Sequence, residues 1–197
     1  MGVDFKRPFM HKIIITLMMS LFVIACQAQR FKHSVGGGFS IADFKTINNN
    51  GADVLSRSII QLNATYYPHF EIIRLKTSSL YIGSPISLSY AITTGEGTSV
   101  GFGYDLPLIL EHKLKFSKKK SLEGYYGAGL GYIYYGKLST NLKFKRTNTQ
   151  LYTHAGVRFP MSKGTWTIEG IRLGVFYEKG FGTANYPRTG LSLLADL

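Results

Sequence analysis

Serine and histidine are the side chains of this 197-residue chain that could support nucleophilic catalysis, but their spacing is unfavourable. His33 and Ser34 are adjacent, so in an extended strand they point to opposite faces and cannot form a Ser–His pair. His154, near Arg158, fits a structural hydrogen-bonding group. The five His residues show no metal-ligand spacing such as H-x-x-x-H, and a single Cys excludes a Cys-rich zinc module. We therefore assign no catalytic, metal or cofactor residue and expect no enzyme activity.

The composition bounds the class of protein. Apolar residues make up 45% of the chain and charged residues 17%, which excludes disordered and collagen-like chains. The 23 Lys and Arg outnumber the 11 Asp and Glu, but they are spread evenly and no nucleic-acid-reading element is recognisable. We expect one domain that does not bind nucleic acid.

The N-terminus has the pattern of an export signal. A basic segment precedes the run Ile13–Ala25, whose 13 residues are apolar except for Thr16 and Ser20. A membrane-spanning helix needs roughly 20 apolar residues, so this run is too short to be one. We predict that residues 1–28 are a cleaved signal peptide, with Met10 as an alternative start, and that residues 29–197 form the mature domain.

Cys26 leaves two processing routes open. The segment Val23-Ile24-Ala25-Cys26 resembles a bacterial lipobox, in which the Cys is acylated and becomes the mature N-terminus. Cleavage after Ala28 would instead make Gln29 the first residue. The first route predicts a lipid anchor and the second does not.

Downstream of the leader, apolar and polar residues alternate with a period of two, as in β-strands. In Ser99–Ser117 the even-numbered positions carry most of the apolar side chains, and the odd-numbered positions carry glycine and charged residues. In the segment 166–177 the parity changes, and a bulge near Glu169-Gly170 would restore one apolar face. The pattern predicts eight strands, at about 31–43, 57–67, 80–93, 99–116, 124–135, 149–159, 166–177 and 190–197. The second strand has an alternative end, because it could run on past Pro68 through Phe70 and Ile72.

Eight strands with one apolar face each fit a closed antiparallel up-and-down β-barrel of either polarity. A lipocalin-like barrel would turn the apolar face inward around an apolar ligand, and a transmembrane barrel would turn it outward to lipid. The polar face is rich in glycine and carries charges of both signs, which suits a crowded interior and favours the transmembrane barrel. The expected interior charge network consists of Asp105, Glu111, Lys113, Arg158 and Arg172.

Several segments resemble the small porin-like outer-membrane β-barrel family of Gram-negative bacteria. They are Ser-Val-Gly-Gly-Gly-Phe-Ser (34–40), Ala-Thr-Tyr-Tyr-Pro (64–68), Ser-Leu-Tyr-Ile-Gly-Ser-Pro-Ile-Ser-Leu (79–88), Phe-Gly-Tyr-Asp-Leu-Pro-Leu-Ile-Leu (102–110) and Gly-Ala-Gly-Leu-Gly-Tyr (127–132). The resemblance covers essentially the whole mature chain. It implies insertion in the outer membrane by the barrel-assembly machinery, contact with outer-membrane lipid and a monomeric state.

With the mature N-terminus in the periplasm, the predicted extracellular connections are 44–56, 94–98, 136–148 and 178–189. The connection 136–148 carries four cationic side chains and no acid. These side chains suit lipopolysaccharide phosphates, and the alternative is a solvated basic loop. The four residues are Lys137, Lys143, Lys145 and Arg146.

An eight-stranded barrel is only wide enough for its own side chains, so a general diffusion channel is disfavoured. We expect a structural, adhesive or receptor-like protein that acts through its extracellular loops. The first alternative is a soluble or lipid-anchored lipocalin-like barrel that binds an apolar ligand. The second is an outer-membrane enzyme that modifies lipid A, for which the sequence identifies no catalytic residue.

Overall fold

The computed structural model describes residues 31–47, 53–93, 99–116, 122–138, 145–161, 167–181 and 187–197. The chain divides into two compact units, Met1–Phe31 and Lys32–Leu197, and the fold below is that of the second. The predicted signal peptide, including Cys26, lies outside the described residues. No helix in the described ranges is long and apolar enough to cross a membrane.

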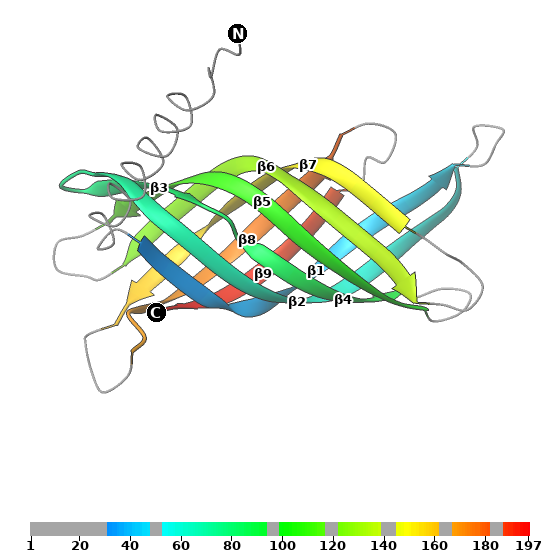
Figure 1. Ribbon diagram of the computed structural model, residues 1–197, viewed down its shortest axis with the longest axis horizontal. Coiled ribbons are helices and arrows are strands. Elements are labelled where there is room, and N and C mark those ends of the chain that lie inside the picture. The colour runs from blue at the N-terminus through cyan, green and yellow to red at the C-terminus, as the bar shows by residue number, and fades with distance from the viewer. Residues whose placement is uncertain are drawn as a thin grey trace, which may run out of the picture. The chain divides into compact units, whose positions relative to one another are not determined.

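The second unit is one antiparallel sheet that closes on itself (Figure 1). β1 pairs with β9 and with β2, which joins the two ends of the strand order. β3 and β4 both lie between β2 and β5, one after the other, so the ring has eight strand positions. The predicted eight-stranded up-and-down barrel is confirmed. The strands are β1 Phe31–Ile47, β2 Asp53–Arg74, β3 Ser78–Gly83, β4 Ile86–Thr93, β5 Ser99–Lys115, β6 Glu123–Leu138, β7 Lys145–Pro160, β8 Gly170–Gly180 and β9 Pro187–Asp196.

The apolar faces of the strands lie on the outside of the ring. On β5, Leu108 is 59% exposed, whereas Asp105 and Ile109 are each 1% exposed. The same alternation runs along β8, where every second residue is buried. An apolar exterior around a polar interior is the arrangement of a barrel that faces lipid, and it is the reverse of the lipocalin-like alternative.

The segment predicted as one strand at 80–93 is two strands, because it is interrupted at Ser84 and Pro85. Proline has no N–H to donate to the ladder. Two backbone hydrogen bonds hold the chain in place at this interruption. The Ser84 N–H donates to the Pro68 carbonyl at 3.0 Å, and the Ile86 N–H donates to the Ser84 carbonyl at 2.9 Å. β3 and β4 therefore keep the same neighbours on either side of the break.

β2 is longer than predicted. It continues past Pro68 to Arg74, with a bulge between Glu71 and Ile73, and pairs there with β3. The end predicted at residue 67 is therefore wrong, and the alternative in which the strand runs on past Pro68 through Phe70 and Ile72 is the one that the structure shows. Only Leu75, Lys76 and Thr77 separate the two strands, and the Leu75 N–H donates to the Ser78 carbonyl at 2.8 Å.

The strand predicted at 166–177, with its bulge near Glu169-Gly170, is also wrong at its start. β8 begins at Gly170 and pairs with β7 and β9 in continuous register up to its other end. Thr167, Ile168 and Glu169 precede the strand. The alternation of β8 therefore does not include them, and no bulge is needed to explain the change from even-numbered to odd-numbered apolar residues. Trp166 lies outside the described residues.

The connection predicted at 136–148 is shorter in the structure. β6 and β7 stay paired through Tyr135 with Arg146 and Gly136 with Lys145. Each added pair satisfies backbone groups that would otherwise need water, so the ladder continues into the basic segment. Lys137, Lys145 and Arg146 are therefore at strand ends, and Lys143 lies outside the described residues.

Glycines on the interior face make room for inward aromatic rings. A Cβ atom on Gly174 would lie 2.2 Å from the Tyr125 hydroxyl, and one on Gly190 would lie 2.4 Å from the Phe176 ring. Neither distance is possible without movement. The glycine-rich polar face therefore complements the large rings that fill the barrel.

Gly174→Ala is expected to destabilise the barrel by about 1–3 kcal/mol through overpacking against the Tyr125 hydroxyl. Tyr125→Phe removes that oxygen, and the next atoms then lie 3.0 Å or more away. The double variant should recover part of the lost stability, as measured by urea unfolding of the refolded protein. Val175→Leu, on the exposed neighbour of Gly174, is the control and should change little. Equal stability of Gly174→Ala with and without Tyr125→Phe would contradict this account.

Candidate functional site in the barrel interior

The inward side chains form successive layers along the barrel, and the first lies toward the end opposite the start of β1 and the end of β9. Arg188 on β9 forms ion pairs with Asp105 on β5 and with Glu178 on β8, the latter at 2.7 Å. The Arg188 guanidinium also donates to the Gln61 side-chain oxygen at 3.0 Å. One arginine thus binds carboxylates from two strands on different sides of the ring.

An apolar layer lies between the charged layers. Two of its rings, Tyr152 and Phe176, are stacked with centroids 6.0 Å apart. All of its side chains are at most 7% exposed, so the layer is buried in the barrel interior. The layer consists of Tyr67, Ile109, Tyr152, Phe176 and Leu194.

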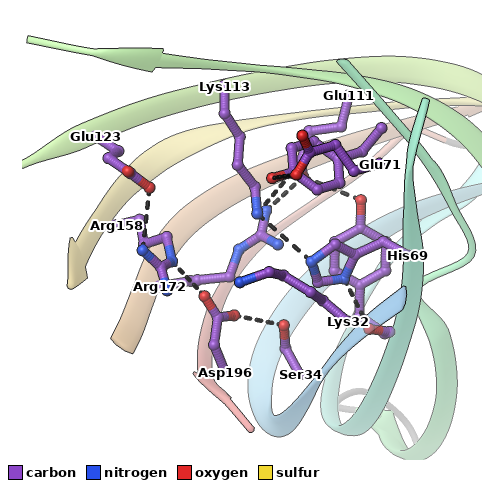
Figure 2. Close-up of polar contacts among 12 residues, drawn as sticks. Lys32, Ser34, His69, Glu71, Glu111, Lys113, Glu123, Arg158, Arg172 and Asp196 are labelled. Atoms are coloured by element: carbon purple, nitrogen blue, oxygen red, sulfur yellow. Dashed lines mark hydrogen bonds and ion pairs between the residues drawn. The ribbon is translucent and has the colours of Figure 1, made fainter. Parts of the chain in front are cut away.

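A second charged layer is centred on Glu111 of β5 and Arg172 of β8 (Figure 2). The same Glu111 oxygen that pairs with Arg172 accepts a hydrogen bond from the Tyr67 hydroxyl at 3.1 Å. The Arg172 guanidinium lies 4.2 Å from the Tyr125 ring centroid, on the face where a cation is attracted. Both charged groups are therefore buried with opposite charge and aromatic surface around them.

Two histidines border this second layer. His154 Nε2 lies 3.1 Å from Glu111 Oε2, and its ring packs edge-on to Tyr67 and Tyr125. The His69 ring stacks on Tyr67 with centroids 4.7 Å apart. Lys113 completes the layer, with its Nζ 3.7 Å from Glu111 Oε1.

The last layer lies at the end where β1 starts and β9 ends. Arg158 forms ion pairs with Asp196 and, at 3.0 Å, with Glu123. Asp196 also accepts a hydrogen bond from the Ser34 hydroxyl at 2.5 Å. This layer connects β7, β9, β6 and β1, so it spans the seam at which the ring closes (Figure 2).

All five residues of the predicted interior network are buried inside the barrel, but in different layers. Asp105 belongs to the first, Glu111, Lys113 and Arg172 to the second, and Arg158 to the last. Sequence reasoning missed their partners Glu178, Arg188 and Asp196. The first two lie in the segment 178–189, which was predicted as a connection, although β8 extends into it to Gly180 and β9 begins in it at Pro187. Both have even numbers, like the inward residues Arg172 on β8 and Leu194 on β9. This parity could have predicted that they also point inward.

The interior does not assemble a Ser–His pair among the described residues. Ser34 is buried and bound to Asp196, whereas His33 lies near the Tyr66 ring on the other face of β1, as predicted. His112 is on the outer face, where its Nδ1 lies 2.9 Å from the Tyr126 hydroxyl. Within the same ranges, no three His, Cys, Asp or Glu side chains gather as metal ligands.

Arg172→Met is expected to cost about 3–5 kcal/mol of unfolding free energy, because it leaves Glu111 as a buried charge without its main partner. The double variant Arg172→Met with Glu111→Gln removes both charges and should recover much of that loss. Lys32→Met is the control: Lys32 pairs with Glu169 at 2.9 Å, but the two side chains are 30% and 45% exposed, so the cost should stay below about 1 kcal/mol. Urea unfolding in detergent measures all three, and an Arg172→Met effect no larger than the control would contradict the role of the pair.

No protein-family model matches the chain, and no curated protein matches it in sequence. Among solved structures, the chain is similar to the outer membrane protein OprG from Pseudomonas aeruginosa, with a TM-score of 0.52 and 12% identity over 84% of this chain and 93% of that one. Neisserial surface protein A superposes with a TM-score of 0.49 and 12% identity over 85% of this chain and 96% of that one. The likeness to OprG shows the fold. The chain therefore has the fold of the small eight-stranded outer-membrane β-barrel proteins, as its strand patterns indicated.

Proposed function

We propose that the protein is a closed outer-membrane barrel with a structural, adhesive or receptor-like role, which it performs through the connections at the end opposite the start of β1 and the end of β9. In this proposal a cleaved leader exports the chain, the barrel-assembly machinery inserts it, and it works as a monomer in contact with outer-membrane lipid. The apolar exterior supports the membrane environment. Because side chains fill the interior, the proposal assigns the function to the loops and not to transport through the barrel.

The observation that carries this proposal is the burial of the inward side chains at successive levels. A water-filled channel would leave its lining residues accessible to water. Instead Arg172 and Tyr67 are each 1% exposed and Glu111 is 0% exposed, although their side chains point to the barrel axis. Two ionic layers with an apolar layer between them give an ion no hydrated path.

Two measurements test the proposal. Cell fractionation with unboiled and boiled gel electrophoresis should place a heat-modifiable band in the outer-membrane fraction, and mass spectrometry should define the mature N-terminus as Gln29 or acylated Cys26. The purified protein in planar lipid bilayers should give no stepwise conductance. Steady ion conductance by the folded wild type would overturn the closed-barrel assignment.

A charge on the outer face should distinguish lipid contact from solvent contact. Leu108→Arg places a cation midway along β5 and should cost about 2–4 kcal/mol in a phospholipid bilayer, whereas the same change near an interface costs about 0–1 kcal/mol. Phe116→Arg, one residue beyond the end of β5 and also exposed, is the matched control. Equal stability of the two variants in vesicles would argue that this face does not contact hydrocarbon.

We further propose that the basic segment between β6 and β7 binds the phosphates of lipopolysaccharide. Support comes from its four cations, of which Lys137 on β6 and Lys145 and Arg146 on β7 flank the connection that contains Lys143. Each cation near an anionic surface contributes about 1 kcal/mol. The arginine can also bind a phosphate through two parallel hydrogen bonds.

Replacing Lys137, Lys143, Lys145 and Arg146 by Gln should weaken binding to lipopolysaccharide micelles at least about tenfold, and wild-type binding should fall with added salt. The control replaces Lys118, Lys119 and Lys120, which lie between β5 and β6 at the opposite end, and should leave binding unchanged. If both sets weaken binding equally, the interaction reflects overall charge and the proposed segment has no specific role.

A further inference from the structure

A polar pocket of about 250 Å³ opens at the end of the barrel where β1 starts and β9 ends. It is far from the connections invoked above, so an inference about it goes beyond the proposed function. Its wall contains two carboxylates, Glu71 and Glu123. The cationic side chains in the wall number five: Lys32, Arg74, Lys113, Lys115 and Arg158.

The two carboxylates in the wall already have partners. Glu71 accepts hydrogen bonds from Arg74 at 2.5 and 2.8 Å and from the Tyr81 hydroxyl at 3.1 Å. Glu123 accepts one from Arg158 at 3.0 Å. Lys32 is also occupied, since it pairs with Glu169 at 2.9 Å. Neither carboxylate of the wall is paired with the two lysines of β5, Lys113 and Lys115.

Lys113 is buried, with its side chain 7% exposed, yet its ammonium group has only distant polar contacts. Its Nζ lies 3.7 Å from Glu111 Oε1, 3.5 Å from His69 Nε2 and 4.2 Å from the Tyr81 ring centroid. An ammonium–carboxylate hydrogen bond normally measures about 2.7–2.9 Å. Figure 2 shows the long Lys113 side chain reaching from β5 toward these groups.

Lys115 lies two residues further along β5, so it projects from the same face of the strand as Lys113. It is exposed at the mouth of the pocket and forms no ion pair with any side chain in the described ranges. Ser78 and Ser79 on β3, which pairs with this part of β5, also line the pocket. The pocket wall thus brings two lysines and two serines together.

We propose that this pocket binds a small phosphate-type oxyanion, held mainly by Lys113 and Lys115. A phosphate carries three or four acceptor oxygens and a charge near −2, so it can bind both ammonium groups and a hydroxyl at once. The volume exceeds that of the ion and admits an ester substituent. The source is either free phosphate or the phosphomonoester headgroup of a lipid.

The test uses the full chain refolded in a detergent without phosphate groups. Inorganic phosphate is titrated by calorimetry at constant ionic strength, because added salt alone screens exposed charges. Wild type should bind phosphate saturably. Lys113→Gln and Lys115→Gln should each weaken binding about tenfold, as expected for loss of a charge-assisted hydrogen bond. Lys179→Gln, which removes an exposed lysine near the other end of β8, should bind like wild type.

Lys115 is exposed, so its variant is expected to fold even if Lys113→Gln does not, and the heat-modifiable gel shift verifies folding of each. A second titration with dihexanoyl phosphatidic acid separates the two sources. Tighter binding than inorganic phosphate indicates a lipid headgroup, and equal binding indicates the free ion. Absence of saturable binding, or equal affinity of folded Lys115→Gln and Lys179→Gln, would overturn the proposal and leave the closed-barrel function untouched.

Discussion

Closure of the sheet by pairing of β1 with β9 is the constraint on which the rest of this structure depends. Every strand then has a neighbour on each side, so the backbone hydrogen-bonding groups are satisfied within the ring and no open edge remains. Closure with eight strand positions also sets the interior width, which is just enough for side chains. The period-two alternation places half of the residues in that narrow space.

The interior composition follows from this narrow width. Large rings such as Tyr125 and Phe176 fit only where Gly174 and Gly190 face them. The buried arginines are paired with carboxylates, because a buried charge without a partner is strongly destabilising. The arginines at 158, 172 and 188 meet this requirement by joining carboxylates from different strands, and the pairs thereby hold distant parts of the ring together.

The same layering connects structure and proposed roles. The inward side chains are buried in successive layers, so in the proposed closed barrel any specific activity is expected at the two ends. At one end the strands β6 and β7 carry a basic segment, and at the other the lysines of β5 face a polar pocket. The two ends are therefore associated with two separate groups of cationic residues in the sequence.

Much of the fold was predictable, because alternation of apolar and polar residues is a local property of each strand. The sequence by itself determined the eight strand positions of the ring, the apolar outer face of β5, and the inward position of Asp105, Glu111, Lys113, Arg158 and Arg172. It did not determine where strands end, as Arg74, Gly170 and Arg188 show, because strand length depends on pairing with a neighbour. It also left open that Arg188 pairs with Asp105 while Arg172 pairs with Glu111. Only the register and closure of the ring decided those partners, because they bring together side chains that lie on strands far apart in the chain.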